Sequence, residues 1–238
     1  MYYIIANFGD DSVALIQWAY ECDFRNTIVL SVDTRWQAEA WKARVQTASK
    51  WIYKLNFKYQ QLTTEYGFSE LVLARNYFPS KKFHWCANFL KGLTLLNWLE
   101  RSDPLGKGII LLPHRRSMSK GQEDLPDEIE DSEKFDNRKL CYPLANFNED
   151  MRNELISKTP FKTPLNHRSL ECQPCIYLTQ KDLPLAIEDV EKTERLEAKI
   201  NQPMFSKKIR EYTKRIRKEN NYYDSFSSAC SWEYSCGL

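Results

Sequence analysis

The first hundred residues alternate short apolar runs with longer stretches in which apolar positions recur at a helical period. Residues 2–6 and 27–32 have the length and composition of buried strands, whereas 12–21 and 38–55 have the spacing of amphipathic helices. This strand-helix-strand-helix order predicts an α/β fold with a parallel twisted sheet, right-handed crossovers and flanking helices. Ligands of such a fold are expected at the carboxyl ends of the strands.

The pattern continues less regularly through the middle of the chain. Residues 71–74 are a further strand candidate, 87–100 predict a helix, and 108–112 predict a compact buried strand. Residues 119–139 are crowded with Asp and Glu and contain few apolar side chains, which predicts a mobile acidic surface loop.

The C-terminal part differs in composition from the rest. Residues 148–158 and 188–200 predict charged helices, and 207–218 predict a strongly basic one. We therefore expect one α/β domain over residues 1–185, followed over 186–238 by a helical, basic extension with a flexible cysteine-containing tail.

Charge and hydropathy exclude some classes of protein. The 34 basic and 32 acidic side chains nearly balance, so the net charge of +2 indicates no partner. No apolar run approaches the roughly 20 residues of a membrane span, and the chain start does not read as a signal peptide, which predicts a soluble cytoplasmic protein without a membrane partner. Without an export signal, the seven cysteines indicate thiols, metal ligands or a redox centre more than a disulfide framework.

A polar turn joins the first predicted strand to the first predicted helix. It contains Gly9, and Ser12 lies on the first turn of the helix, where backbone amides and the helix dipole can bind a phosphate group. Asp11 or Ser12 could equally cap the helix. Two adjacent acids, Asp10 and Asp11, suit a phosphate site only if a metal ion or an adenine contact uses them.

Polar residues also follow two other predicted strands. Asp33 and Thr34 end the second strand, where they could meet a nucleotide or cap the next helix. Arg115 and Arg116 follow the strand at 108–112, and their planar guanidinium groups suit an anion clamp, the alternative being a solvated loop.

Five cysteines carry the candidate sulfur or metal chemistry. Cys172 and Cys175, spaced as Cys-Gln-Pro-Cys, can close on one zinc or iron ion or form a redox disulfide. Cys86 and one of Cys230 or Cys236 would complete four ligands, although Cys86 alone also suits a small buried hydrophobe. Cys236, third from the end and beside a glycine, could enter and leave a site as a thiolate. The two remaining cysteines look structural: Cys22 and Cys141.

Taken in order, these segments resemble the phosphoadenylyl sulfate (PAPS) reductase family of the adenine nucleotide alpha hydrolase-like (PP-loop) superfamily. The similar segments are the phosphate-binding loop at residues 7–12, Asp33-Thr34 with Glu39, Trp85-Cys86 with Lys91, the Pro-Leu stretch at 143–150, the pair Cys172 and Cys175, and the closing Cys-Gly-Leu at 236–238. Several positions depart from the family pattern. Asp10 stands where ATP-using relatives place Lys, Arg35 replaces a glycine, and Trp85-Cys86 replaces paired cysteines. Tyr234 and Ser235 also differ from the usual residues before the terminal Cys, and the final His is absent.

The resemblance implies an enzyme that reduces an adenylyl sulfonucleotide, either adenylyl sulfate (APS) or PAPS. The Cys236 thiolate would attack the sulfur, and a thioredoxin-like reductant would release the resulting thiosulfonate. The implied nucleotide-binding residues are Asn7, Phe8, Gly9, Asp10, Asp11, Ser12, Asp33, Thr34, Arg115 and Arg116. Reductase relatives also suggest a homodimer.

Two alternatives remain open. A PP-loop enzyme using ATP and Mg²⁺ could insert sulfur into tRNA or DNA, with a cysteine desulfurase as donor and the basic helix at 207–218 facing the nucleic acid. Cys86, Cys172, Cys175 and Cys230 would then bind a 4Fe-4S iron-sulfur cluster or zinc. The other alternative is a non-catalytic nucleotide-binding protein.

Overall fold

A mostly parallel six-stranded sheet forms the centre of the protein. The structure, a computed structural model, describes residues 1–118, 122–178 and 189–211. Within them the strand order is β3-β2-β1-β4-β6-β5, parallel throughout except that β5 runs antiparallel to β6. The strands are β1 (Tyr2–Ile5), β2 (Thr27–Asp33), β3 (Lys58–Thr63), β4 (Ile109–Leu111), β5 (Glu128–Ser132) and β6 (Arg138–Cys141). The predicted α/β class is therefore confirmed.

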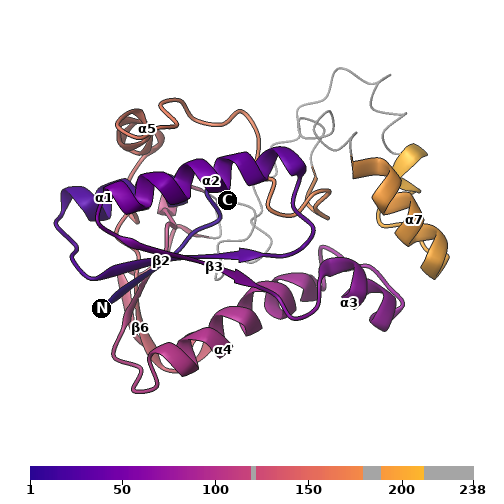
Figure 1. The fold of residues 1–238 in the computed structure, drawn as a ribbon, viewed down its shortest axis with the longest axis horizontal. Coiled ribbons are helices and arrows are strands. Elements are labelled where there is room, and N and C mark those ends of the chain that lie inside the picture. Colours follow the sequence, from indigo (N-terminus) through magenta and orange to yellow (C-terminus); the bar gives the residue numbers. More distant parts are fainter. Residues whose placement is uncertain (119–121, 179–188, 212–238) are drawn as a thin grey trace.

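Helices cover both faces of the sheet (Figure 1). They are α1 (Asp10–Glu21), α2 (Glu39–Lys54), α3 (Phe68–Arg75), the π-helix η1 (Ala87–Gly92) that runs directly into α4 (Leu93–Ser102), α5 (Glu149–Ser157) and α7 (Val190–Ile200). Short 3₁₀ turns form η2 (Arg116–Met118) and η4 (Glu133–Phe135). In Figure 1, α1 and α2 lie on one side of the sheet and α4 on the other. The helices predicted over 148–158 and 188–200 are confirmed as α5 and α7.

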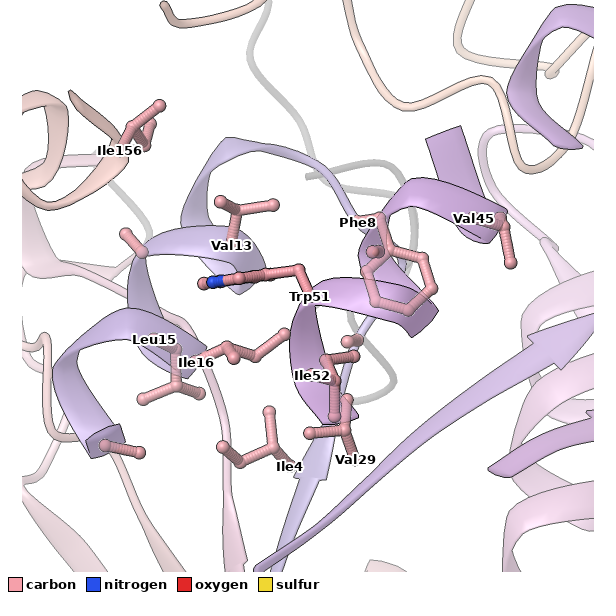
Figure 2. Close-up of a cluster of buried hydrophobic side chains, with 14 of the residues drawn as sticks. Ile4, Phe8, Val13, Leu15, Ile16, Val29, Val45, Trp51, Ile52 and Ile156 are labelled. Atoms are coloured by element: carbon pink, nitrogen blue, oxygen red, sulfur yellow. The ribbon is translucent and has the colours of Figure 1, made fainter. Parts of the chain in front are cut away.

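Side chains that alternate along the strands divide the core between the two faces. Ile4 of β1 packs with α1, α2 and α5, in the cluster shown in Figure 2. Its neighbours Tyr3 and Ile5 point to the other face and pack with Leu95 and Leu99 of α4. Both faces of β1 are thus buried, as expected for a central strand of a parallel sheet.

A third apolar cluster joins segments that follow different strands. It contains Trp36 after β2, Val72 of α3, Leu90 of η1, Ile176 from the loop before residue 178, and Leu196 of α7. This cluster brings the segment around Cys86 and the Cys172–Cys175 segment together.

Two segments have a secondary structure that their pattern of polar and apolar residues did not predict. Residues 71–74 belong to α3, not to a strand, since a four-residue apolar run does not distinguish helix from strand. The third strand is instead β3, which the sequence pattern did not predict. It lies at the sheet edge, and most of its side chains are exposed and polar.

The acidic segment expected as a loop over 119–139 contains β5, η4 and the start of β6. Lys139 contacts Glu128 at 2.9 Å and Glu130 at 2.6 Å, and Phe135 is fully buried. Ion pairs between the antiparallel strands β5 and β6 therefore compensate part of the acidic charge from which a loop was expected. Most of the predicted basic helix and the whole cysteine-containing tail lie outside the described residues.

Candidate functional site

The carboxyl ends of β1, β2 and β4 meet in the middle of the sheet. β1 pairs with β2 on one side and with β4 on the other, and the chain order of the strands reverses there. Open α/β sheets bind ligands at such a switch point. The segments that follow these three strands contain all the residues predicted from the sequence to bind a nucleotide.

The turn after β1 is held in shape by Asn7. The Asn7 Oδ1 accepts hydrogen bonds from the Gly9 amide at 2.8 Å and from the Ser12 hydroxyl at 3.0 Å. Gly9 is the N-cap of α1, and Phe8 adopts φ of 60° although it is bulky and fully buried. A bulky residue in this region is strained, and such strain is often found at functional sites. The first turn of α1 presents the positive end of a helix dipole at this point.

Two carboxylates and three arginines surround that first turn. Asp11 Oδ1 accepts a 2.6 Å hydrogen bond from Arg115 Nε, and both side chains are only 6% exposed. Arg152 Nη1 lies 3.9 Å from Asp11 Oδ2. Asp10 accepts hydrogen bonds from the Leu165 amide, with oxygen distances of 3.1 and 3.0 Å. An anion bound at the start of α1 would therefore lie next to the protein's own carboxylates.

Burial dominates the protonation of Asp10. Desolvation raises the pKa of Asp10, and the Leu165 amide, Arg152 and Arg44 oppose this effect. A carboxyl group whose charged form is disfavoured can lose its charge when another anion approaches.

Arg44 of α2 is the third arginine, and the sequence analysis missed it. Its Nε donates to the Phe8 carbonyl at 2.7 Å, and its guanidinium group lies 4.1 Å from the Phe161 ring centroid. Its buried Nη2 has no hydrogen-bond partner among the described residues and lies 3.8 Å from Asp10 Oδ1. Desolvation lowers the pKa of Arg44. Arg44 is spaced three residues after Trp41 and four before Ala48, both buried in α2. This helical spacing is the feature of the sequence that could have indicated an inward-facing arginine.

The two arginines predicted to form one clamp point to different partners. Arg115 reaches Asp11 and Ser117, whereas Arg116 donates to the Leu125 carbonyl at 2.8 Å and to Asp127 at 3.0 Å. Arg116 also contacts Asn146. Only Arg115 of this pair is joined to the first turn of α1.

Asp33 and Thr34 shape the turn after β2. Asp33 Oδ1 accepts from the Arg35 amide at 2.9 Å, and the Thr34 hydroxyl donates to the Glu171 carbonyl at 2.9 Å. Arg35 has φ of 53°, a conformation that favours glycine. This geometry explains why a glycine suits this position in the family that the sequence resembles. The turn is linked further to the Cys172–Cys175 segment, because Gln173 N donates to the Trp36 carbonyl at 2.7 Å.

Three of the predicted metal-ligating cysteines come together next to this turn. Cys86, Cys172 and Cys175, called the thiol cluster below, all pack against the third apolar cluster. Burial, followed by repulsion from Cys175 and Cys172, raises the pKa of Cys86. Cys172 Sγ lies 3.5 Å from the Thr34 hydroxyl, which connects the thiol cluster to the carboxyl end of β2.

A buried ion pair lies beside Cys172. Lys91 of η1 contacts Glu171, and their side chains are 4% and 8% exposed. Burial and then Glu171 raise the pKa of Cys172 to about 12, whereas Lys91 lowers it. The thiols of Cys86 and Cys172 are therefore neutral at physiological pH. Glu171 gave no signal in the sequence because its partner is 80 residues away.

The thiol cluster does not form a metal-binding arrangement by itself. Across residues 1–118, 122–178 and 189–211, no group of three or more His, Cys, Asp or Glu side chains is positioned to hold a metal ion. The remaining candidate ligands, Cys230 and Cys236, lie outside these residues. The same part of the chain contains no helix long and apolar enough to cross a membrane.

Comparison with known proteins identifies similarity only at the level of solved structures. No protein-family profile and no curated protein matches the sequence. The PAPS reductase from Candida auris, in its phosphate complex, is 14% identical with a TM-score of 0.47, covering 68% of this chain and 74% of its own. The FMN adenylyltransferase from Candida glabrata, with FMN and the ATP analogue AMPCPP, is 11% identical with a TM-score of 0.46, covering 99% of this chain and 78% of its own. Similarity at this level does not transfer an activity.

Proposed function

We propose that this chain is a PAPS-reductase-like enzyme of the adenine nucleotide alpha hydrolase-like superfamily. One observation supports the proposal above all: segments that resemble the family motifs, although far apart in the sequence, lie at one edge of the sheet. Cys172 Sγ lies 3.5 Å from the Thr34 hydroxyl across 138 positions, and Lys91 contacts Glu171, the residue before Cys172, across 80. These contacts join three of the segments that resemble family motifs.

In this proposal the first turn of α1 binds the phosphate groups of the nucleotide. Arg115 and Arg44 supply positive charge on two sides of the turn, and the first-turn amides supply donors. Protonation of Asp10 lowers the repulsion that a phosphate group would meet.

The proposed chemistry uses the thiolate of Cys236. Its sulfur forms a bond to the sulfonate sulfur, the sulfur–oxygen bond to the nucleotide breaks, and the nucleotide leaves with that electron pair. One thiol of a thioredoxin-type reductant then attacks the Cys236 sulfur, which breaks its bond to the sulfonate sulfur, releases sulfite and leaves a mixed disulfide. The second thiol of the reductant displaces the Cys236 thiolate and closes the reductant's own disulfide. Cys86 and Cys172, which are neutral, do not act as the attacking group.

Calorimetric titration with PAPS, APS and ATP with Mg²⁺ tests the nucleotide site. Removing Arg115 alone would leave the buried Asp11 with only the more distant Arg152 as a charged partner, so the informative variant is the double substitution Asp11→Asn with Arg115→Gln. We expect it to weaken sulfonucleotide binding at least about tenfold, in line with the loss of one charge-assisted contact. The matched control is Asp127→Asn with Arg116→Gln, an ion pair that follows the same strand but does not contact the turn. Equal affinities of both variants and the wild type would refute this site.

Turnover of PAPS or APS with a dithiol reductant tests the nucleophile. Cys236→Ser should abolish turnover and leave nucleotide affinity unchanged, and Cys230→Ser is the matched control in the same tail. Retained turnover in Cys236→Ser would remove the nucleophile. Nucleotide binding without turnover in the wild type would favour a non-catalytic nucleotide-binding protein.

The gathering of Cys86, Cys172 and Cys175 favours a second candidate, an ATP-dependent sulfurtransferase with an iron-sulfur cluster or zinc. To hold the metal together with a fourth thiol from Cys230 or Cys236, these three thiols would have to move closer to one another than they are in this structure. The metal would then carry sulfur or clip the segments together. Anaerobic purification followed by iron, sulfide and zinc analysis decides between the candidates. Stoichiometric iron and sulfide, with release of pyrophosphate from ATP, would replace the reductase by the sulfurtransferase.

A further inference from the structure

A long stretch of the chain next to the thiol cluster contains no acidic residue. Residues 71–99 include Arg75, Lys81, Lys82 and Lys91 and no Asp or Glu. Lys91 is buried with Glu171, but Lys81 and Lys82 are exposed. The segment runs from α3 through η1 into α4 (Figure 1). The positive charges of its exposed lysines are therefore not balanced by any carboxylate of the same segment.

Aromatic rings alternate with these cations. Phe83 follows Lys82 directly and is 59% exposed, in a turn closed by reciprocal 3.1 Å hydrogen bonds between the Phe83 and Ser80 backbones. Phe89 is 42% exposed, and the Arg75 guanidinium group lies 4.3 Å from its ring centroid. The turn holds a phenyl ring out into solvent although its burial would be favourable.

The buried Tyr177 connects this segment to the thiol cluster. Its hydroxyl donates to the Lys81 carbonyl at 3.2 Å, and its ring lies 5.6 Å from the Arg168 guanidinium group. Arg168 belongs to a second acid-free stretch, residues 155–170. Tyr177 belongs to the third apolar cluster, against which Cys86 and Cys175 also pack.

We propose that this basic-aromatic surface binds single-stranded nucleic acid. It consists of Arg75, Lys81, Lys82, Phe83 and Phe89. Cations placed between exposed rings suit a strand whose phosphates meet Lys81 and Lys82 and whose bases stack on Phe83. The carboxylates at its margins are already paired, Glu70 with Arg35 and Asp189 with Lys192. The proposal does not depend on the nucleotide site, which lies around the first turn of α1.

Fluorescence anisotropy of the full chain with labelled single-stranded RNA, single-stranded DNA and duplex of mixed sequence tests the surface. Lys81→Gln with Lys82→Gln should weaken single-strand binding about tenfold and reduce the slope of log affinity against log salt by about 1.4, the value for two phosphate contacts. Phe83→Ala should weaken it between about 5-fold and 100-fold, as expected for the loss of one stacked base. Stronger binding of RNA or of DNA would identify the strand.

Matched controls separate the surface from general electrostatics. Lys54→Gln with Lys58→Gln removes the same charge at the end of α2 and the start of β3, and Tyr20→Ala removes a ring that is 49% exposed at the end of α1. Both controls should bind like the wild type. Every variant retains the basic residues of 207–218, so that segment contributes equally to all of them. Equal losses in the controls, unchanged affinity in the Lys81 and Phe83 variants, or tighter binding of duplex would overturn the proposal. Unchanged PAPS affinity in these variants would keep the two proposals distinct.

Discussion

The first turn of α1 buries ion pairs, whereas burial keeps Cys86 and Cys172 of the thiol cluster neutral. Around the turn, Asp11 is balanced by Arg115, and Arg44 contacts Asp10. In the thiol cluster, Cys86 and Cys172 are protonated because burial raises the pKa of both thiols. The thiol cluster is joined to the turn after β2, because Thr34 contacts Glu171 and Cys172.

This difference indicates how each region could respond to a ligand. An anion that enters beside the arginines can replace a carboxylate as their partner, and Asp10, whose pKa is raised by burial, can take up a proton as it does so. Cys86 or Cys172 must lose a proton before it can act as a nucleophile or a metal ligand. In the proposed function the first region would therefore respond to an anion, and the second to a cation.

The largest expected effect is on the buried pair of the first region. Arg115→Ala should lower the free energy of unfolding by about 3–4 kcal/mol, because it leaves the buried Asp11 carboxylate with only the more distant Arg152 as a charged partner. Urea unfolding measures it. Arg116→Ala is the control and should cost about 1 kcal/mol or less, since Arg116 is 29% exposed and its partner Asp127 is largely exposed. Similar losses for both variants would contradict the assignment of Arg115 as the buried partner.

The buried pair beside the thiols gives the next effect. Lys91→Met should lower the free energy of unfolding by about 3 kcal/mol, because Glu171 loses its buried partner. Adding Glu171→Leu should recover most of that loss, which a double-mutant cycle in urea measures. Additive losses in the double variant would show that the two side chains are not coupled.

Alkaline pH should destabilise the protein through ionisation of the buried Cys172 thiol. Its pKa is raised from the ordinary thiol value of 9.0 to about 12, so its contribution to stability is complete below pH 9 and is lost as pH rises toward 12. At about pH 10 the expected loss is about 1 kcal/mol, and Cys172→Ala should not show it. Urea unfolding across this pH range measures the difference, with Cys22→Ala, an exposed cysteine, as control. Parallel pH profiles for the wild type and Cys172→Ala would contradict the prediction.

The smallest effect is expected at Asp10. Because burial raises its pKa above 3.8, the stability contributed by Asp10 is fully present below that value and is lost as pH rises through the raised pKa. Asp10→Asn keeps an acceptor for the Leu165 amide and should stabilise the protein at neutral pH by about 0.5 kcal/mol. It should also increase sulfonucleotide affinity severalfold, because a negative charge near the phosphate groups is removed. Unfolding at acidic and neutral pH, together with calorimetric titration, checks both effects, and a destabilised Asp10→Asn with unchanged affinity would contradict them.

Elements with strong local patterns could be predicted from the sequence, and elements defined by their neighbours could not. The buried strands β1 and β2 and the amphipathic α1 and α2 carry their periodicity in consecutive residues. By contrast, β3 is a polar edge strand whose hydrogen-bond partner is β2, and its sequence lacks an apolar pattern. Edge strands of this kind are assigned by pairing, which single-sequence patterns do not contain.

The candidate site divides in the same way. Gly9, Ser12, Asp33 and Thr34 could be selected because they follow predicted strands, the places where α/β sheets bind ligands. Arg44 escaped notice because an arginine on a long helix usually faces solvent, and here it turns inward to the Phe8 carbonyl.

The sequence by itself determined the alternation of strands and helices, and through it the parallel sheet and the edge at which its polar turns emerge. These features follow from periodicity and turn chemistry within a few residues. Only the tertiary structure decided that Arg115 and Arg44 meet the acids of α1, that Lys91 meets Glu171, and that Cys86 meets Cys172. The physical reason is that these contacts join distant segments, and their proximity depends on how the whole chain buries its apolar surface.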